Sequence, residues 1–466
     1  MKRSLCFLLG IFLSQLVQAQ QVEGDWYGLL NVGAGTQMEI VFHIKKTDKG
    51  YSSLMDSPDQ KAKDIPVANT SFENNLLKLD MSNFKIEYSG KLIENSKIVG
   101  TFTQNGKSIP MNLTHDRQKK KSASRPQNPT EPYPYVSEKV NIPNPATNGK
   151  LAGILTLPSK EGSFPVVVLI SGSGPQNHDE EIMGHKPFLV LSDFLTRQGF
   201  AVLRYDDRGV AGSDGDFAKA TSRDFANDVK TVVAYLKTRK DINAKKIGLL
   251  GHSEGGAIAP LVASELKDIA FIVLMAGTGV SGGDLLLAQQ QEVGKVYGQS
   301  AEDLKNTKEF FTGAFAIITE KLYPEAKKTK LTDYVKKAIK TNPKFSIPKD
   351  MTETDFVNSQ VNQLLTPWME YFINYNPATA LQKVTCPVLA LNGDKDVQVP
   401  ADMNLSAIEV ALKKAGNTQY AVKKMANMNH LFQECKTGSP EEYEATAQTI
   451  SPLALDEIGN WLKALK

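Results

Sequence analysis

Hydrophobic and polar residues alternate with a period of two over the first part of the chain. Residues 23–116 contain few stretches of helical period, and their short alternating runs are separated by turns such as Asp48-Lys49-Gly50. The clearest runs are 38–44, 76–81, 84–88 and 97–102. A period of two places successive side chains on opposite faces of a sheet. The pattern predicts an all-β domain over residues 20–116, folded as a small barrel or a sandwich.

From about Tyr135 the pattern changes to short apolar runs that alternate with amphipathic helical stretches. The apolar runs predict strands buried on both faces, at 165–171, 200–205, 246–251, 271–276 and 387–392. Helical spacing occurs over 188–197, 222–239 and 255–266, with Ser222 as a plausible start of the second helix. Residues 135–466 are therefore expected to form a mostly parallel sheet flanked by helices.

Two further segments differ from this alternation. Residues 117–134 are rich in Lys, Ser, Gln and Pro, which predicts a linker that includes the basic run Lys119–Lys121. About 110 residues separate the strand that ends near Ala276 from the strand that begins at Pro387, far more than an ordinary connection. This insertion has helical spacing over 285–297, 301–323, 331–338 and 355–375. It predicts a helical cap over about 278–382.

The N-terminus has the features of a signal peptide. Lys2 and Arg3 precede an apolar stretch that is too short to span a bilayer, and Val17-Gln18-Ala19 offers a cleavage site. We expect residues 1–19 to be removed and the mature protein to be secreted or periplasmic, without a membrane span; an uncleaved anchor is the alternative. The two cysteines that remain, Cys386 and Cys435, are expected to be free thiols.

Composition adds exclusions. The net charge is +3, with 41% hydrophobic and 23% charged residues, as in soluble globular proteins. Nucleic-acid binding is not expected, because it needs a concentrated basic face. No metal or organic cofactor is expected either, because no His/Cys/Asp cluster has ligand spacing and no Gly-x-Gly-x-x-Gly follows a strand.

A candidate nucleophile lies between a predicted strand and a predicted helix. Residues 251–255 read Gly-His-Ser-Glu-Gly, a G-x-S-x-G motif. A serine on a sharp strand-to-helix turn has strained backbone angles, and glycines two residues away on either side remove the clash with neighbouring elements. The helix N-terminus also stabilises negative charge beside the serine. The motif predicts that Ser253 is a nucleophile.

A serine nucleophile needs a base, and the base needs an acid to orient it. In this type of fold the order along the chain is serine, acid, histidine. His430 is the histidine that follows the G-x-S-x-G motif in the chain, and it lies in a turn after an apolar strand at about 420–422. Asp394 and Asp396 both follow the strand at 387–392, and spacing alone does not choose between them.

Residues from about 140 to 466 resemble the α/β-hydrolase fold, in particular bacterial exported esterases with a Gly-His-Ser-Glu-Gly-Gly elbow and an N-terminal β domain. In that family the acid commonly stands in G-x-x-D before Val-Pro, which matches Asp396 and leaves Asp394 as a turn former. The family's D-x-R-G-x-G-x-S stretch appears at 206–213, where the resemblance implies a structural role.

Two backbone amides are needed to hold the oxyanion of an acyl-transfer intermediate. One is expected from Glu254, directly after the nucleophile. The other should come from the turn 171–175, where Ser171 replaces the family's usual His. Aligning Gly172 with the family's glycine assigns this donor to Ser173, with Gly174 as the alternative.

The expected function is hydrolysis of small-molecule carboxylic esters through an acyl-enzyme. A serine peptidase of the prolyl-oligopeptidase type and a thioesterase share this machinery and are the alternatives. The former usually carries a propeller with repeats of 40–45 residues, which the β domain lacks. A binding protein without activity is a further alternative, although every expected catalytic position is occupied.

Overall fold

The computed structural model describes residues 22–33, 36–60, 62–93, 96–104, 106–118, 125–341, 347 and 351–465. The chain forms two compact units, Met1–Ala123 and Ser124–Lys466, so that the boundary falls inside the predicted linker. The predicted signal peptide at 1–19 and the basic run Lys119–Lys121 lie outside the described residues.

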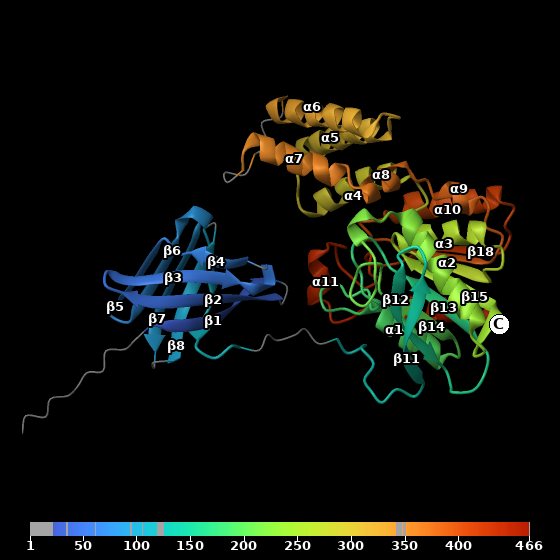
Figure 1. Ribbon diagram of the computed structural model, residues 1–466, viewed down its shortest axis with the longest axis horizontal. Helices are drawn as coiled ribbons and strands as arrows, with labels where there is room; N and C mark the ends of the chain where they lie inside the picture. Colours follow the sequence, from blue (N-terminus) through green and yellow to red (C-terminus); the bar gives the residue numbers. More distant parts are fainter. Residues whose placement is uncertain are drawn as a thin grey trace, which may run out of the picture. The chain divides into compact units, whose positions relative to one another are not determined.

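The first unit is the expected all-β domain, and it is a barrel (Figure 1). Its strands pair in an antiparallel sheet in which β10 bonds to both β1 and β8, and this double pairing closes the sheet. The strands are β1(Gly24–Gly33), β2(Thr36–Thr47), β3(Gly50–Ser57), β4(Ala62–Pro66), β5(Asn69–Glu73), β6(Leu76–Met81), β7(Ile86–Ile93), β8(Lys97–Gln104), β9(Lys107–Pro110) and β10(Leu113–Thr114).

The barrel interior follows the alternating pattern of the sequence. Along β7 buried and exposed residues alternate without a break, and Tyr88 is among the buried ones. Trp26 is fully buried and its indole N–H donates to the carbonyl of Val22 at 2.8 Å. The apolar side chains of the barrel form a core of their own.

The second unit is built on a sheet of order β11-β12-β14-β13-β15-β16-β17-β18. The pairs β11–β12 and β12–β14 are antiparallel and the others are parallel. The strands are β11(Val136–Asn144), β12(Gly149–Leu157), β13(Phe164–Ile170), β14(Ala201–Tyr205), β15(Ile242–His252), β16(Phe271–Met275), β17(Val388–Gly393) and β18(Tyr420–Met425). This mostly parallel sheet confirms the predicted fold class.

Helices cover both faces of the sheet, which explains why its central strands are apolar throughout. One face packs against α1(Pro187–Arg197) and α12(Pro452–Ala464). The other packs against α2(Ser222–Thr238), α3(Gly255–Glu265), α9(Ala378–Leu381) and α10(Ala401–Lys414). The short helix α11(Glu441–Ala445) precedes α12. None of the helices in the described ranges is long and apolar enough to cross a bilayer.

Helix α2 begins at Ser222, as the sequence suggested, and the residue before it provides the N-cap. Thr221, not Ser222, is the N-cap residue, and its hydroxyl accepts from the backbone N–H of Asp224. The Asp224 carboxylate in turn accepts from the backbone N–H of Thr221, at 2.9 Å. This is a capping box in which aspartate replaces the usual Glu or Gln.

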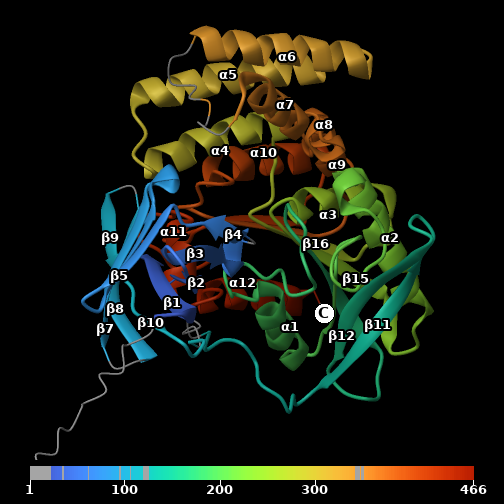
Figure 2. The same cartoon turned by 60° about the vertical axis from the view of Figure 1, so that its left-hand side comes forward.

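The insertion between β16 and β17 forms the predicted helical cap, with an apolar core of its own. Its helices are α4(Gly282–Val296), α5(Ala301–Thr319), α6(Pro324–Thr341), α7(Glu353–Leu364) and α8(Pro367–Asn374). In both views α4 and α8 lie between the sheet and the other cap helices (Figures 1 and 2). The single helix expected over 355–375 is two helices, because α8 begins anew at Pro367 with Thr366 as its N-cap.

The second half of the predicted linker is attached to the second unit by hydrogen bonds. The Arg125 guanidinium donates to the carbonyls of Glu444 and Thr446, at 2.9 and 3.0 Å. The Gln127 amide donates to the carbonyl of Ile450 at 2.7 Å. Low apolar content led the sequence analysis to extend the linker to 134, whereas polar side chains fix this segment by binding backbone carbonyls.

Candidate active site

The G-x-S-x-G motif forms the sharp turn between β15 and α3. Ser253 has a φ of 54°, in the left-handed region that a residue with a side chain seldom adopts. Its backbone N–H donates to the carbonyl of Met275 at 2.8 Å. A Cβ atom on Gly251 would overlap the carbonyl of Gly255, and one on Gly255 would overlap that of Ile170. The two glycines are therefore required by contact, and Ser253 is held at the carboxyl end of the sheet.

The structure brings Asp396 and His430 together at the ends of β17 and β18. Asp396 Oδ2 lies 2.8 Å from His430 Nδ1, and both side chains are buried. Asp396 Oδ1 accepts from the backbone N–H groups of Gln398 and Val399, each at 2.8 Å. The carboxylate is thus oriented by three donors, and the imidazole is oriented by the carboxylate.

Asp394 occupies the same turn but is directed differently. It is exposed, and its backbone N–H donates to the carbonyl of Met425 at 2.9 Å. Of the two carboxylates that spacing left open, the structure places Asp396 against His430 and leaves Asp394 at the surface. This is the arrangement that the family resemblance implied.

The turn after β13 lies directly against the elbow. A Cβ atom on Gly172 would be 3.1 Å from the Cβ of Ser253. The backbone N–H of Gly172 donates to Glu180 Oε1 at 2.7 Å, so this amide already has a partner, and Ser173 is the next residue of the turn. Ser173 lines the cavity described below, whereas a Cβ on Gly174 would point into open space. The amide of Glu254 begins α3 on the other side of Ser253.

A buried carboxyl group, that of Asp207, also holds the turn after β13. Asp207 accepts from the Ser171 hydroxyl at 2.8 Å and from the backbone N–H of Gln176 at 3.0 Å. Burial raises the pKa of Asp207 to about 8, because the hydrogen bonds that favour its ionised form only partly offset desolvation. The residue belongs to the D-x-R-G-x-G-x-S stretch, whose expected structural role agrees with these contacts.

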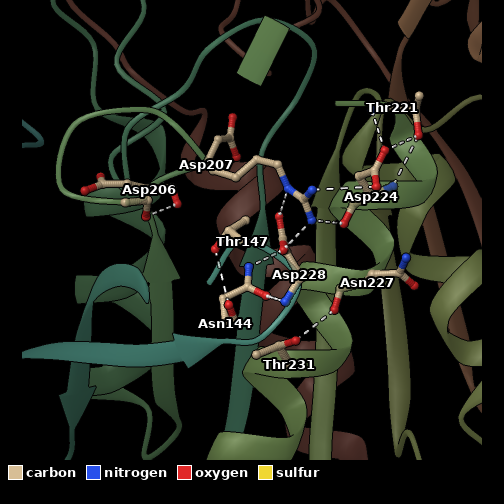
Figure 3. A network of polar contacts seen from close by, with 12 residues as sticks. Asn144, Thr147, Asp206, Asp207, Thr221, Asp224, Asn227, Asp228 and Thr231 are labelled. Carbon is tan, nitrogen blue, oxygen red and sulfur yellow. Dashed lines mark hydrogen bonds and ion pairs between the residues drawn. The ribbon is translucent and has the colours of Figure 1, made fainter. Parts of the chain in front are cut away.

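The rest of that stretch forms a polar network beneath the turn (Figure 3). Arg208 makes a bidentate ion pair with Asp228, with both N···O distances 2.7 Å. Asn144 donates to the same carboxylate at 2.6 Å. Arg208 and Asp228 are both buried, so each charge depends on the other for compensation.

Ser253 and His430 line one cavity of about 450 Å³, between the carboxyl ends of the strands and the cap. The cap contributes apolar side chains from α4 and α8, and the turns of the sheet contribute the polar groups. Lining residues from the cap are Leu285, Leu286, Gln289, Trp368 and Phe372, and those from the sheet side include Gly172, Ser173, Glu180, His252, Glu254 and Leu431.

Glu254 links the two walls of the cavity. Its buried carboxyl group accepts from the Ser222 hydroxyl at 2.5 Å and from the Trp368 indole N–H at 2.8 Å. Burial raises the pKa of Glu254, although hydrogen bonds from Ser222, Trp368 and Ser173 oppose the shift. The side chain of Glu254, the residue directly after Ser253, is therefore hydrogen-bonded to the cap.

Sequence reasoning did not identify three residues of this site. Glu180 lies in no motif, Trp368 lies in the cap, and His252 was noted only as part of the G-x-S-x-G motif. The His252 side chain contacts Glu180 and the His430 carbonyl, at 3.0 Å each. A histidine inside the elbow motif was the one available signal. Within the described ranges, no group of three His, Cys, Asp or Glu residues could hold a metal ion.

The fold is that of an α/β-hydrolase, with the G-x-S-x-G turn, Asp396 and His430 at the carboxyl ends of the strands. Residues 187–434 match the family described as serine aminopeptidase, S33, and the chain belongs to that family.

Among curated proteins, the esterase EstD of Thermotoga maritima is 26% identical over 453 residues, which cover 93% of this chain and 97% of that protein. A mitochondrial acyl-coenzyme A thioesterase of mouse is 25% identical over 151 residues, or 32% of this chain and 30% of that protein. Among solved structures, an esterase of Pyrococcus furiosus aligns with a TM-score of 0.42 and 18% identity, covering 74% of this chain and 98% of its own.

Proposed function

We propose that the protein hydrolyses carboxylic esters of small molecules through an acyl-enzyme on Ser253. The observation that carries the proposal is the hydrogen bond between Asp396 and His430, because His430 lines the same cavity as the strained Ser253. An acid, a base and a nucleophile in this order are what acyl transfer requires.

In the proposed reaction Ser253 Oγ attacks the ester carbonyl while His430 takes its proton. The amides of Glu254 and Ser173 donate to the oxyanion, and Asp396 stabilises the imidazolium that forms. Collapse of the intermediate expels the alcohol, which takes the proton from His430. Water, activated by His430, then releases the acid and restores the serine.

The cavity favours esters over peptides with a free N-terminus. An aminopeptidase must hold the ammonium group of its substrate, and a carboxylate is the usual partner for such a cation. Among the described residues that line the cavity, the carboxylates are Glu180 and Glu254. Protein groups bond to Glu254 and to Glu180 Oε1, and Glu180 Oε2, which has no partner, is buried away from solvent. The match to an esterase over nearly the whole chain supports the same choice, since the thioesterase match covers about a third.

The proposal is tested with three substrates: p-nitrophenyl butyrate, an aminoacyl p-nitroanilide and butyryl-coenzyme A. We expect turnover of the ester to exceed turnover of the anilide by several orders of magnitude. Turnover of the thioester should be lower than turnover of the ester. A fluorophosphonate probe should label Ser253, and Ser253→Ala should abolish both labelling and turnover. Ser264→Ala, which changes a serine at the far end of α3, is the matched control. Fast cleavage of the anilide without turnover of the ester would favour the peptidase alternative.

We also propose that the protein is exported with cleavage after Ala19. The positively charged start, the short apolar stretch and the small residues before Gln20 support this proposal. N-terminal sequencing of protein recovered from the periplasm or the medium should begin at Gln20. Recovery of the intact N-terminus from the membrane fraction would indicate an uncleaved anchor instead.

A further inference from the structure

Two buried side chains outside the proposed triad contact each other beside Ser253. Glu180 and His252 are 1% and 4% exposed, and Glu180 Oε1 lies 3.0 Å from His252 Nδ1. The other ring nitrogen of His252, Nε2, lies 3.0 Å from the carbonyl oxygen of His430. Glu180 has a φ of 51°, a strained angle that the surrounding contacts must maintain.

The hydrogen-bond partners determine how many protons His252 carries. A carbonyl oxygen only accepts, so Nε2 must bear a hydrogen to bond His430. Glu180 Oε1 already accepts from the Gly172 amide at 2.7 Å, so an ionised Glu180 requires a hydrogen on Nδ1 as well. His252 is then an imidazolium paired with a carboxylate, and the pair is neutral as a whole.

This pair contacts three of the turns that make up the site, those after β13, β15 and β18. His252 directly precedes Ser253, Gly172 directly precedes Ser173, and the third contact is the backbone of His430 itself. We propose that Glu180 and His252 are a positioning pair, which holds the oxyanion turn and the base turn in register around the nucleophile and keeps the charge behind His430 at zero. The inference rests on the proposed function, because it assigns roles relative to that triad.

The charged groups around the pair come from several elements. The ring of His430 lies 4.8 Å from that of His252, and Asp396 acts on His252 through its charge from the turn after β17. Asp207 interacts through its charge with Glu180 and with Glu254, the N-cap residue of α3. Burial lowers the pKa of His252, but the Glu180 carboxylate and the His430 carbonyl outweigh burial and leave it raised. Removal of the charge of either Glu180 or His252 would therefore change the net charge next to His430.

His252→Gln and Glu180→Gln test the proposal, with kcat/KM measured against pH on p-nitrophenyl butyrate. His252→Gln leaves an unpaired carboxylate that favours the protonated base, so the acidic limb should move to higher pH by on the order of one unit. Glu180→Gln keeps the shape and removes the negative charge, so the limb should move to lower pH or stay. Both variants should lose roughly 10²-fold in kcat with a smaller change in KM, as expected for misplaced groups. The double variant should return the limb toward the wild-type position.

His185→Gln is the matched control, because His185 is also a buried histidine, which contacts Thr449 Oγ1, the Tyr443 carbonyl and the Gln433 amide. It should lower thermal stability without moving the acidic limb. Limbs that move in the same direction in His252→Gln and Glu180→Gln, or do not move in either, would overturn the proposal.

A measurement on the wild-type protein covers the case in which the variants do not fold. Imidazole ¹⁵N spectra should show one histidine with both nitrogens protonated from pH 6 to 9, and a single-tautomer neutral ring at His252 would overturn the ion pair. Failure of the proposed function looks different, since wild-type protein would then lack esterase activity and fluorophosphonate labelling at Ser253.

Discussion

The two walls of the cavity are built by different kinds of interaction. On the sheet side, the short turns at the ends of β13, β15, β17 and β18 are fixed by hydrogen bonds to buried carboxyl groups. Examples are the bond from the Ser171 hydroxyl to Asp207 and the bond between His430 and Asp396. On the cap side, α4 and α8 present apolar side chains and pack on the separate core of the cap.

The difference shows which wall is suited to chemistry and which to selection. Hydrogen bonds fix direction, so they suit groups that must be placed to within a fraction of an ångström. Apolar contacts tolerate exchange of similar side chains, so a cap held by them can change its shape while the reactive groups stay in place. The Trp368–Glu254 hydrogen bond is one of the polar links between the two walls. Variants of each wall should therefore fail in different ways.

The largest effect is expected from the sheet side, in Asp396→Asn. The amide oxygen would remain with the N–H groups of Gln398 and Val399, so the NH₂ group would face His430 Nδ1. The imidazole would then carry its proton on Nε2 and could not accept the serine proton. We expect kcat to fall by about 10⁴-fold. Asp394→Asn, two residues away and exposed, should stay within a few-fold of wild type in the same esterase assay. The reverse result would make Asp394 the acid.

The contrast between Asp394 and Asp396 shows how much of the candidate site could be predicted from the sequence. Ser253 was found from local spacing, because the glycines that the turn requires are its near neighbours in the chain. Asp394 and Asp396 are equally close to the end of β17, and only the direction of the turn separates them. That direction depends on contact with His430, 34 residues further on. The family resemblance supplied the choice that spacing could not.

The elements were predicted best where the pattern is periodic. The closed barrel and the buried central strands follow from periods of two and from apolar runs, whereas the β11–β12 hairpin was not located. Glu180 could not be found, because it has no motif and its partners Gly172 and His252 depend on the tertiary fold. The break at Pro367 was visible in the sequence, but the helical spacing on either side of it was read as continuous.

The next effect is on stability, in the polar network beneath the sheet-side turns. Arg208→Met leaves the Asp228 carboxylate buried with Asn144 as its remaining donor among the contacts described above. We expect the free energy of unfolding to fall by about 3–5 kcal/mol, measured by urea denaturation. Arg197→Met, which breaks the exposed pair with Asp193, should cost about 0.5 kcal/mol or less. Equal losses would mean that burial does not distinguish the two pairs.

A smaller effect is expected from the cap wall, and it concerns selectivity. Leu286→Trp adds bulk to a residue of α4 that lines the cavity. The kcat/KM for an octanoyl ester should fall by roughly tenfold relative to that for an acetyl ester, in line with the few kcal/mol that pocket contacts contribute to discrimination. Leu287→Trp, next on the same helix and packed on the cap core, should leave the ratio unchanged. A uniform loss for both esters would show that α4 acts on the reactive groups themselves.

The smallest effect is a pH dependence of stability that arises from Asp207. Its pKa in the folded protein is about 8, well above that of a free aspartate, so the folded state holds a proton that the unfolded chain has already released. Stability from this group is complete below the ordinary aspartate pKa and is lost as pH rises toward 8. Asparagine cannot titrate, so Asp207→Asn does not lose this stability. The Tm of the variant minus that of the wild type should therefore rise by at least about 2 °C from pH 5 to pH 8. Asp216→Asn, at an exposed residue paired with Lys219, should show no such gain, since its carboxylate is ionised in both states over this range. A Tm difference for Asp207→Asn that is flat across the same range would mean that Asp207 is ionised beneath the oxyanion turn. The carboxylates of the sheet-side wall would then hold the turn by charge rather than by neutral hydrogen bonds.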